Sequence, residues 1–269
     1  MTNKVKRPTT AVILAGGKGT RILEESQSRP KPMIEIGGRP ILWHIMRMYD
    51  FHGIKNFIIC AGYKQHHIKE YFFNYKLFSS DVTIKTSQGF QTGIEFHKNN
   101  SASWNITVVD TGEETMTGGR VKRIAQYLPD DEPFCLTYGD GVSDIDISKS
   151  IDFHLEHGKK ATVAGVIPPA RFGALKLSKD NLVESFVEKP IDEAGYINGG
   201  FFVLSKDIID LIDGDDTIFE QKPLETVAKN GELVAFLHNG FWQPMDTLRD
   251  NRNLCKLWDE GKAPWRVWK

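Results

Sequence analysis

Short apolar runs that alternate with amphipathic segments organise this chain. Residues 11–15 (AVILA) contain no polar position, which is typical of a strand buried on both faces of a parallel sheet. Residues 57–61 repeat this pattern, and residues 40–49 and 65–75 carry apolar positions at helical spacing. Strands that alternate with helices in this way predict a parallel sheet with helices on both of its faces.

The alternation continues along the rest of the chain. We expect further strands at residues 104–110, 134–138, 161–167, 196–204 and 233–237. We expect further helices at residues 121–128, 147–157, 207–212, 219–229 and 247–259. Pro40 stands where a helix can begin, and Asp246 stands where it can cap the last helix. Residues 111–120 form a long loop after a strand, the place where open parallel sheets bind ligands.

Two segments break this rhythm and predict β-hairpins. Residues 82–85 and 93–96 flank a stretch rich in Gly, Gln and Ser. We interpret this insertion as an exposed excursion used in subunit contact, and a lid or part of a base pocket is the alternative. Residues 174–177 and 183–187 flank a Lys-Asp-Asn turn and predict a hairpin that closes over the sheet edge.

These elements together predict an α/β fold: a Rossmann-like mixed, mostly parallel sheet, flanked by helices and extended by added β-hairpins. No internal repeat or low-complexity linker divides residues 11–269, so we expect a single domain. Residues 1–10 carry three basic side chains without the apolar segment of a signal peptide, so we expect a flexible leader.

Composition narrows the classes of function. The chain has 269 residues, of which 40% are hydrophobic, enough for a sizeable core. Its net charge is −1, so no basic field favours nucleic acid, and no apolar run approaches the ~18 residues of a membrane span. Cys60, Cys135 and Cys255 are far apart and form no CxxC pair, so we expect reduced thiols in a cytoplasmic protein.

A glycine-rich turn follows the first apolar run and is the first candidate for chemistry. Gly16, Gly17 and Gly19 would let backbone N–H groups approach a phosphate closely, and Arg21 and Lys31 add positive charge. The spacing matches neither a Walker A loop nor a dinucleotide fingerprint, which argues against an ATPase loop and an NAD site. A tight strand-to-helix turn that is merely rich in glycine is the alternative.

Several longer motifs carry a resemblance to a known family. They are LAGGKGTR, RPKPM, GGRPILWHIMRMY, YGDGVSDID, RFGAL, FVEKP, INGGFFVL and GFWQPMDTLRD, which run from about Thr10 to the C-terminus. In these motifs the chain resembles the sugar-1-phosphate nucleotidylyltransferases, and in particular the cytidylyltransferases that act on glucose 1-phosphate. The resemblance implies transfer of a cytidylyl group from CTP to α-D-glucose 1-phosphate, which yields CDP-glucose and pyrophosphate, with Mg²⁺ as cofactor.

The resemblance also assigns candidate residues for the nucleotide. It implies that Arg21 and Lys31 hold the triphosphate and that both act in catalysis together with Asp140. The nucleotide-binding residues would be Leu14, Ala15, Gly16, Gly17, Lys18, Gly19, Thr20, Arg21, Lys31, Thr115, Arg120 and Gly139. Residues 11–140 would thus form a nucleotide half and residues 141–269 a sugar half of the domain.

Asp140 and Asp246 are the candidate metal ligands. Each stands at the end of a predicted strand, and two acidic residues far apart in sequence could converge on one hard cation such as Mg²⁺. From spacing alone we favour a turn residue at position 140 and a helix cap at position 246. The resemblance reverses this preference, because YGDG and MDT are where the family holds its metal.

The sugar half contains a second set of candidates, again by resemblance. Sugar-phosphate binding would fall to Gly173, Glu188, Lys189, Asn198 and Gly199. For Glu188 and Lys189 the alternative is a surface ion pair before a strand that ends at a proline, which would contribute little energy. His154 and His157 are spaced like a metal pair, but no third ligand is apparent, so we expect no metal there.

Two alternatives remain open on the sequence. The 110–120 loop lacks the stretch of the thymidylyltransferases, which favours CTP over dTTP, although physical chemistry alone does not select the base. Another sugar 1-phosphate, another phosphate-bearing acceptor or another nucleoside triphosphate is one alternative. A non-catalytic nucleotide-binding regulatory module is the second, and retention of Arg21, Lys31, Asp140, Lys189 and Asp246 argues against it. The resemblance further suggests a homo-oligomer and a role in polysaccharide biosynthesis.

Overall fold

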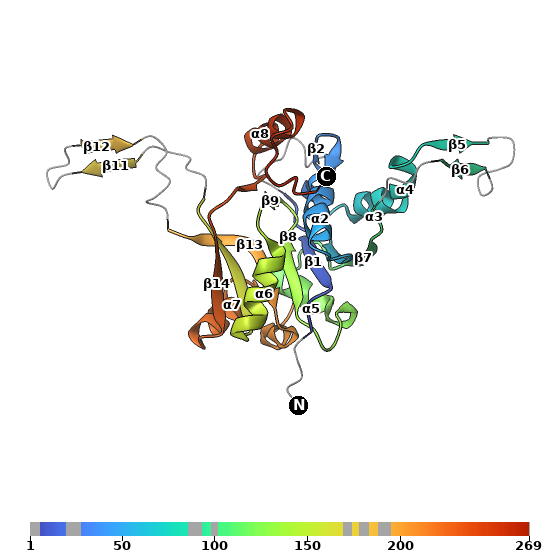
Figure 1. Cartoon of the computed structure of the whole chain (residues 1–269). Coiled ribbons are helices and arrows are strands. Elements are labelled where there is room, and N and C mark those ends of the chain that lie inside the picture. The colour runs from blue at the N-terminus through green and yellow to red at the C-terminus, as the bar shows by residue number, and fades with distance from the viewer. Residues whose placement is uncertain are drawn as a thin grey trace.

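A twisted seven-stranded sheet forms the centre of the protein (Figure 1). The computed structural model describes residues 6–19, 28–85, 93–97, 102–168, 174–177, 183–187 and 195–268. The sheet is built from β1 (Thr10–Ala15), β4 (Asn56–Ala61), β7 (Asn105–Asp110), β8 (Phe134–Tyr138), β10 (Ala161–Val166), β13 (Ile197–Leu204) and β14 (Leu233–His238). Its strand order is β14-β10-β13-β8-β1-β4-β7.

Only β13 runs against the other strands of this sheet. It pairs antiparallel with β8 and β10, whereas β1 pairs parallel with both β4 and β8. After β1 the chain first builds β4 and β7 on one side and then crosses to β8 on the other side. This switch of direction opens a crevice at the carboxyl ends of β1 and β8, where α/β sheets bind ligands. The predicted Rossmann-like mixed, mostly parallel sheet is confirmed.

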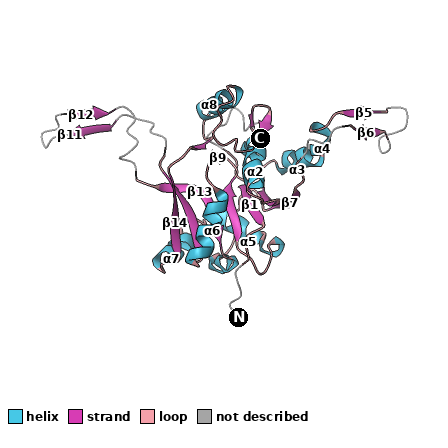
Figure 2. Ribbon diagram, viewed as in Figure 1, coloured by secondary structure: helices cyan, strands magenta, loops and turns pink. Residues whose placement is uncertain are grey.

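Helices cover both faces of the sheet (Figure 2). They are α2 (Ile41–Phe51), α3 (Gln65–Phe73), α4 (Tyr75–Phe78), α5 (Thr117–Arg123), α6 (Ile147–His157), α7 (Lys222–Lys229) and α8 (Leu248–Asp259). Strand β1 is buried at every position because its side chains feed two cores: Ile13 packs with residues of α2 and α6, and Val12 packs with residues of α5 and α7. The apolar run at residues 11–15 therefore has the two-faced burial that its composition predicts.

The loop predicted at residues 111–120 is too long by four residues, because α5 already begins at Thr117. Gly118 and Gly119 donate backbone hydrogen bonds to the Thr217 carbonyl, at 2.9 and 3.3 Å. A Cβ at Gly119 would lie 2.6 Å from the Asp215 backbone. The two glycines permit close packing inside a helix, so a rule that treats paired glycines as loop fails here. The helix predicted at 121–128 instead ends at Arg123, and a 3₁₀ turn follows at Ala125–Tyr127.

Other helix boundaries also differ from the sequence prediction. The helix predicted at 65–75 is interrupted at Asn74, which separates α3 from α4, and the segment predicted as a helix at 207–212 is a 3₁₀ helix, Lys206–Leu211. Helix α7 begins at Lys222 rather than at residue 219. Pro40 precedes the first turn of α2 instead of lying in it.

The prediction that Asp246 caps the last helix is wrong. Thr247 is the N-cap of α8, and its hydroxyl accepts a hydrogen bond from the Asp250 N–H while the Asp250 carboxylate binds the Thr247 N–H. This reciprocal arrangement is a capping box, and it leaves the Asp246 side chain available for other contacts.

Two β-hairpins extend from opposite sides of the body, as Figure 1 shows. β5 (Val82–Ile84) pairs antiparallel with β6 (Ile94–Phe96), and β11 (Ala174–Leu177) pairs antiparallel with β12 (Val183–Val187). Both hairpins were predicted. Ile84 on β5 is 58% exposed, and Ile94 and Phe96 on β6 are also exposed. An isolated two-stranded hairpin is marginally stable in water, and these apolar side chains lie at its surface.

The structure also bears on the expectations about the leader, the cysteines and membrane spans. Of the predicted leader, residues 6–9 are described; Arg7 binds Asp152 and Thr9 binds Glu132. Cys60 and Cys135 are buried and Cys255 is half-buried, all as free thiols, and burial raises the pKa of the first two to about 12. In the part of the chain that the structure describes, no helix has the length and apolar character needed to cross a membrane.

Candidate active site

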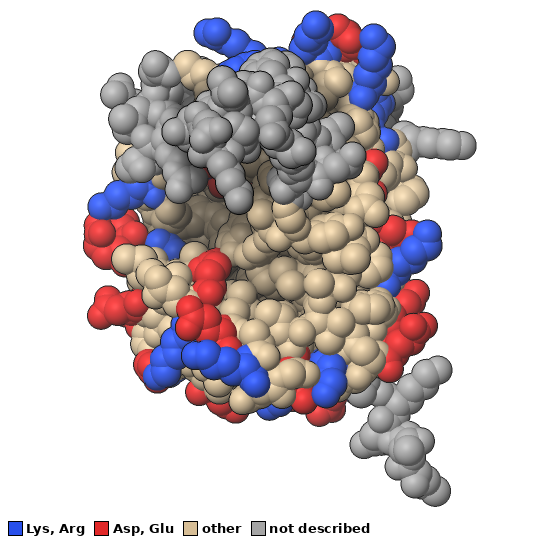
Figure 3. Space-filling view, turned by 90° about the vertical axis from the view of Figure 1, so that its left-hand side faces the viewer, with Lys and Arg blue, Asp and Glu red and all other residues tan. Residues whose placement is uncertain are grey.

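A cavity of about 730 Å³ opens at the carboxyl ends of β1 and β8. Its walls come from the loops after β1, β7 and β8, from the start of α5, from β13 and from the segment around β15 (Trp242–Pro244). Figure 3 shows the body from the side of β13 and β14, where the surface is hollowed and charged side chains gather mostly around the edge. The cavity therefore lies at the crevice that the sheet topology creates.

The described residues of the predicted site all line this one cavity. They are Leu14, Ala15, Gly16, Gly17, Lys18, Gly19, Lys31, Thr115, Arg120, Gly139, Asp140, Asn198, Gly199 and Asp246. Thr20, Arg21, Gly173, Glu188 and Lys189 lie outside the described residues. Segments separated by more than two hundred residues thus meet at one place, although their binding roles remain predictions.

The cavity also has walls that sequence reasoning missed. Tyr138, Thr117 and Trp242 line it, together with Pro32, Glu113, Glu114, Met116, Thr137, Gly141, Gly200, Phe201 and Pro244. Tyr138 precedes the predicted Gly139-Asp140 pair directly, and its position at the carboxyl end of a strand was a usable signal. Trp242 had no such local signal, because its place depends on pairing between distant segments.

The glycine loop lies close to its neighbours at two points. Gly139 donates a backbone hydrogen bond of 2.9 Å to the Leu14 carbonyl, and a Cβ at Gly139 would lie 2.9 Å from that oxygen. A Cβ at Gly16 would lie 1.9 Å from Nη1 of Arg120. Glycine is needed at both positions because backbone or guanidinium occupies the space of a side chain.

Arg120 connects the loops after β1 and β7, on the side of the cavity that we call the loop corner. Its guanidinium donates to Thr111 Oγ1 at 2.8 Å and to the carbonyls of Gly112, Glu113, Gly16 and Ala61, at 2.7, 3.1, 3.1 and 3.5 Å. The residue is 5% exposed, and none of these acceptors is a carboxylate. Burial lowers the pKa of Arg120 from its ordinary value, yet guanidinium stays protonated in proteins. The loops after β1 and β7 therefore surround a cation bound by neutral oxygens.

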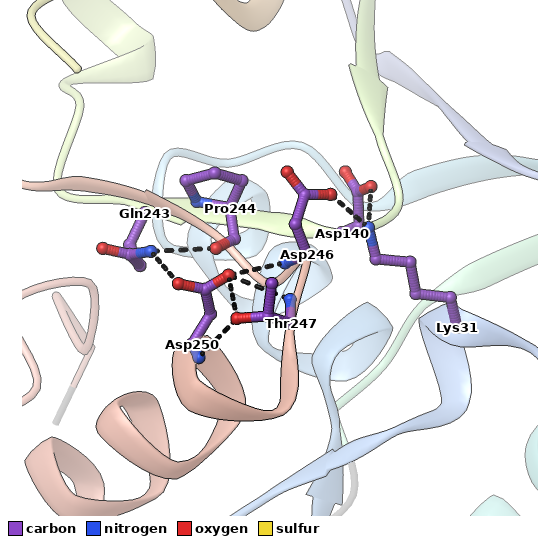
Figure 4. Close-up of polar contacts among 7 residues, drawn as sticks. All are labelled: Lys31, Asp140, Gln243, Pro244, Asp246, Thr247 and Asp250. Carbon is purple, nitrogen blue, oxygen red and sulfur yellow. Dashed lines mark hydrogen bonds and ion pairs between the residues drawn. The ribbon is translucent and has the colours of Figure 1, made fainter. Parts of the chain in front are cut away.

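Lys31 also lines the cavity and lies between the carboxylates of Asp140 and Asp246 (Figure 4). We call these three residues the acidic corner. Lys31 Nζ donates to Asp140 Oδ2 at 2.7 Å and to Asp246 Oδ1 at 2.8 Å. Burial lowers the pKa of Lys31, but the charges and hydrogen bonds of Asp140 and Asp246 outweigh that effect and leave the pKa raised. The ammonium is therefore fully charged near neutral pH, and it holds both carboxylates toward one point.

A two-stranded ladder brings these two carboxylates together. β9 (Gly141–Ser143) follows Asp140 directly, β15 ends two residues before Asp246, and the two strands pair antiparallel. Met245 also donates a backbone hydrogen bond of 2.8 Å to the Asp140 carbonyl. Neither short strand was predicted from the sequence, because three-residue strands carry too little periodicity to be recognised.

The wall opposite the glycine loop is held by a network around Tyr138. Tyr138 donates its hydroxyl hydrogen to Glu220 Oε1, and Thr117 donates to Glu220 Oε2 at 2.7 Å. The Asn198 side chain accepts a hydrogen bond from the Gly200 N–H at 2.8 Å, which fixes its oxygen and directs its amide nitrogen toward the Tyr138 hydroxyl. Trp242 Nε1 binds the Gly199 carbonyl at 2.7 Å. The wall is thus held by hydrogen bonds among five separate segments of the chain.

The donor atoms of the acidic corner suit a hard divalent cation. Asp140 and Asp246 offer carboxylate oxygens on a common target, and Mg²⁺ is usually held by one or two carboxylates together with water and substrate phosphates. No cluster of three or more His, Cys, Asp or Glu side chains suited to a metal occurs among the described residues. Two carboxylates would leave most coordination positions of such a cation open to other oxygen ligands.

The spaced histidines of α6 have a structural role instead. His154 Nδ1 and His157 Nε2 both contact Thr162 Oγ1, at 2.9 and 2.7 Å. Because a hydroxyl has one hydrogen, Thr162 donates at most one of these hydrogen bonds, and a histidine ring donates at least one.

Comparisons with known proteins place this geometry in a family. A family model described as nucleotidyl transferase matches residues 10–247. The chain is 59% identical over 259 residues to a glucose-1-phosphate cytidylyltransferase of Salmonella typhimurium, an alignment that covers 96% of this chain and 99% of that protein. HddC from Yersinia pseudotuberculosis, solved alone and complexed with GMP-PN, matches with TM-scores of 0.68 and 0.66 at 26% identity, over 93% of this chain and 99% of HddC. The chain belongs to the nucleotidyl transferase family and, within it, to the glucose-1-phosphate cytidylyltransferases.

Proposed function

We propose that this chain transfers the cytidylyl group of CTP to α-D-glucose 1-phosphate and so forms CDP-glucose and pyrophosphate. The observation that carries this proposal is the convergence of Lys31, Asp140 and Asp246 in a cavity whose other wall is the glycine loop. Such a reaction joins two anions, and it therefore needs positioning and charge neutralisation more than a covalent nucleophile.

The loop after β1 would hold the triphosphate. Gly16, Gly17 and Gly19 leave its backbone accessible, and the buried Arg120 places a positive charge beneath Gly16. Positive charge held in a protein interior stabilises an anion at the surface above it. Lys31 and Arg21 would bind phosphate oxygens directly, with the role of Arg21 resting on the family resemblance alone.

A divalent metal fits the acidic corner, and nucleotidyl transferases generally use one. We infer that Asp140 and Asp246 hold Mg²⁺ with oxygens of the substrates. When bound, the ion would neutralise phosphate charge and polarise the α-phosphate. Lys31, freed from part of its present pairing, would then turn its ammonium toward the phosphates.

The wall formed by Tyr138, Asn198 and Trp242 would bind the sugar phosphate. Its amide and hydroxyl groups suit sugar hydroxyls, and aromatic rings suit the apolar face of a hexose. Gly199 provides close approach of the backbone, while Gly173, Glu188 and Lys189 enter this site on the family resemblance. An oxygen of glucose 1-phosphate would attack the α-phosphorus as the bond to the β-phosphate breaks, so pyrophosphate leaves opposite the attacking oxygen.

We further infer a homo-oligomer that works in the cytoplasm. The exposed apolar residues of the β5–β6 hairpin support contact with a second copy, since a free two-stranded hairpin gains little stability on its own. The free thiols of Cys60, Cys135 and Cys255 are compatible with a reducing compartment.

The test is pyrophosphate release by the purified protein with glucose 1-phosphate, Mg²⁺ and each of CTP, UTP, dTTP, ATP and GTP. We expect strong release with CTP. Release only with another nucleotide would keep the reaction and discard cytidine, and a panel of sugar 1-phosphates with CTP would test the acceptor in the same way. Absence of release with every pair would favour a nucleotide-binding module without catalysis.

A further inference from the structure

Asp250 lies behind the acidic corner and makes more contacts than a helix cap requires (Figure 4). Its Oδ2 accepts hydrogen bonds from the Thr247 N–H and hydroxyl, both at 2.9 Å, which belong to the capping box of α8. The same oxygen also accepts from the Asp246 N–H at 3.1 Å. Gln243 Nε2 binds the other oxygen, Oδ1, at 3.2 Å. One carboxylate therefore ties together the segment that leads from β15 into α8.

The Asp250 carboxylate is shielded from water, and both of its oxygens accept hydrogen bonds. Asp250 is only 8% exposed, and hydrogen bonds from backbone N–H groups to a carboxylate are strong where water is excluded. Its position in the first turn of α8 also matches the positive end of the helix dipole. These contacts restrict the position of the Asp250 carboxylate and the positions of the groups that donate hydrogen bonds to it.

The backbone around Asp246 is thus fixed on two sides. Met245 binds the Asp140 carbonyl at 2.8 Å, and the next N–H along the chain, that of Asp246, binds Asp250. From this position the Asp246 side chain contacts Lys31, with 2.8 Å between Asp246 Oδ1 and Lys31 Nζ.

We propose that Asp250 is a positioning residue for Asp246: its carboxylate holds the Asp246 backbone so that the Asp246 side chain meets Asp140 at one cation. This inference rests on the metal-binding role of Asp246 in the proposed function. Groups that orient a metal ligand without touching the metal typically contribute 10- to 100-fold in metal affinity or activity. Asp250 acts through the main chain of its ligand, and Gln243 orients Asp250 from the other side.

The test compares Asp250→Ala with Asp250→Asn. Alanine removes all of these contacts, whereas asparagine keeps one oxygen that can accept from the Asp246 and Thr247 N–H groups. We expect roughly 10- to 100-fold weaker binding of Mn²⁺ to the alanine variant in the presence of CTP, measured by electron paramagnetic resonance without glucose 1-phosphate. The Mg²⁺ concentration for half-maximal turnover should rise by a similar factor, and the KM for glucose 1-phosphate should stay within about twofold. Asparagine should recover only part of both losses and should leave Mn²⁺ binding and the Mg²⁺ requirement measurably impaired, because a neutral amide oxygen accepts these hydrogen bonds more weakly than a carboxylate.

Asp146→Ala is the matched control for the loss of a helix cap. Asp146 caps α6 through a 3.0 Å hydrogen bond from the Lys149 N–H and is not among the residues that line the cavity. Its removal should lower the melting temperature as Asp250→Ala does, because a lost cap costs about 1 kcal/mol, but it should leave Mn²⁺ binding unchanged.

Wild-type Mn²⁺ affinity in a folded Asp250→Ala protein would overturn the proposal. If that variant does not fold, Asp250→Asn decides: an unchanged Mg²⁺ requirement in it would equally refute a positioning role. The Mn²⁺ measurement needs no turnover, so it stands apart from the proposed function. If the wild-type protein binds Mn²⁺ with CTP but releases no pyrophosphate, the proposed reaction is refuted. The Mn²⁺ affinities of the Asp250 variants would still test the positioning role.

Discussion

Two buried cations line the same cavity, and their surroundings are opposite in charge. Lys31 contacts two carboxylates, and Arg120 contacts one hydroxyl and four backbone carbonyls. The carboxylates raise the pKa of Lys31 against the effect of burial, whereas burial lowers the pKa of Arg120. The acidic corner therefore has two carboxylates for one ammonium, and the loop corner has a cation held by neutral groups.

This difference assigns a task to each corner. A site with more carboxylate than ammonium charge attracts a further cation, so the Lys31 corner suits a metal ion. A guanidinium that is bound only by neutral oxygens keeps its positive potential for an incoming anion, so the Arg120 corner suits phosphate. Two buried histidines outside the cavity lining show the effect of burial without a charged partner. Burial lowers the pKa of His44 and of His154 to about 4, so both side chains are uncharged near neutral pH.

The largest effect is expected at the acidic corner. Asp140→Asn or Asp246→Asn removes one carboxylate and should reduce turnover by roughly a thousandfold or more, because a metal site supplies several kcal/mol of charge stabilisation. Pyrophosphate release measures the loss, and circular dichroism should show an intact fold. Near-normal turnover in either variant would refute the metal assignment.

Removal of the ammonium should expose the repulsion that it now cancels. Lys31→Met leaves two carboxylates facing each other, and we expect a loss of about 3 kcal/mol in the free energy of unfolding, as for a broken buried ion pair. Mg²⁺ should raise the melting temperature of this variant more than that of the wild type. An equal response to Mg²⁺ in both proteins would mean that Lys31 and the metal do not share these carboxylates.

The loop corner can be tested with a substitution that preserves charge. Arg120→Lys keeps one positive charge but offers three donors in place of the planar fork, so several loop carbonyls lose their partner. We expect a loss of about 2 kcal/mol in the free energy of transition-state binding, or roughly 30-fold in kcat/KM for CTP, with a smaller change in the KM for glucose 1-phosphate. Equal changes for both substrates would show that Arg120 serves the whole cavity rather than the nucleotide side.

The smallest effect is expected from protonation of the buried histidines. The direction of the resulting change in stability with pH follows from their lowered pKa. Because the folded pKa of His154 is about 4, below the ordinary value of 6.5, the unfolded chain binds more protons between these two values. Stability should therefore fall as the pH drops from 6.5 toward 4, by up to roughly 2 kcal/mol per histidine at pH 5, and should not depend on this group above pH 6.5. Urea unfolding at pH 7 and pH 5 measures the loss, and His154→Gln should reduce the difference.

The fold was accessible from the sequence because its strongest signals are local. The apolar run at residues 11–15, the strand at 134–138 and the helix at 147–157 were predicted with boundaries that match the structure to within one residue. The resemblance to cytidylyltransferases is confirmed by a relative at 59% identity. These features depend on residues that are neighbours along the chain, where periodicity is a direct consequence of burial.

The errors have different physical causes. The interpretation of Asp246 as a cap of the last helix, which spacing alone favoured, is wrong because the Thr247 hydroxyl and the Asp250 carboxylate form the cap between residues three apart. Gly118 and Gly119 were placed in a loop, yet they lie in α5 because Asp215 and Thr217 pack against them. At these two glycines, a contact between distant segments overrode the local preference.

The sequence by itself determined the seven strands of the central sheet, most helices, the glycine turn after β1 and the acidic residues at strand ends, because each is encoded by adjacent residues. Only the tertiary structure decided that Lys31 would lie between Asp140 and Asp246, which are 109 and 215 residues away along the chain. It also decided that Arg120 would be bound by backbone carbonyls. Hydrogen bonds and ion pairs of this kind depend on the packing of whole elements, and no local pattern of residues specifies that packing.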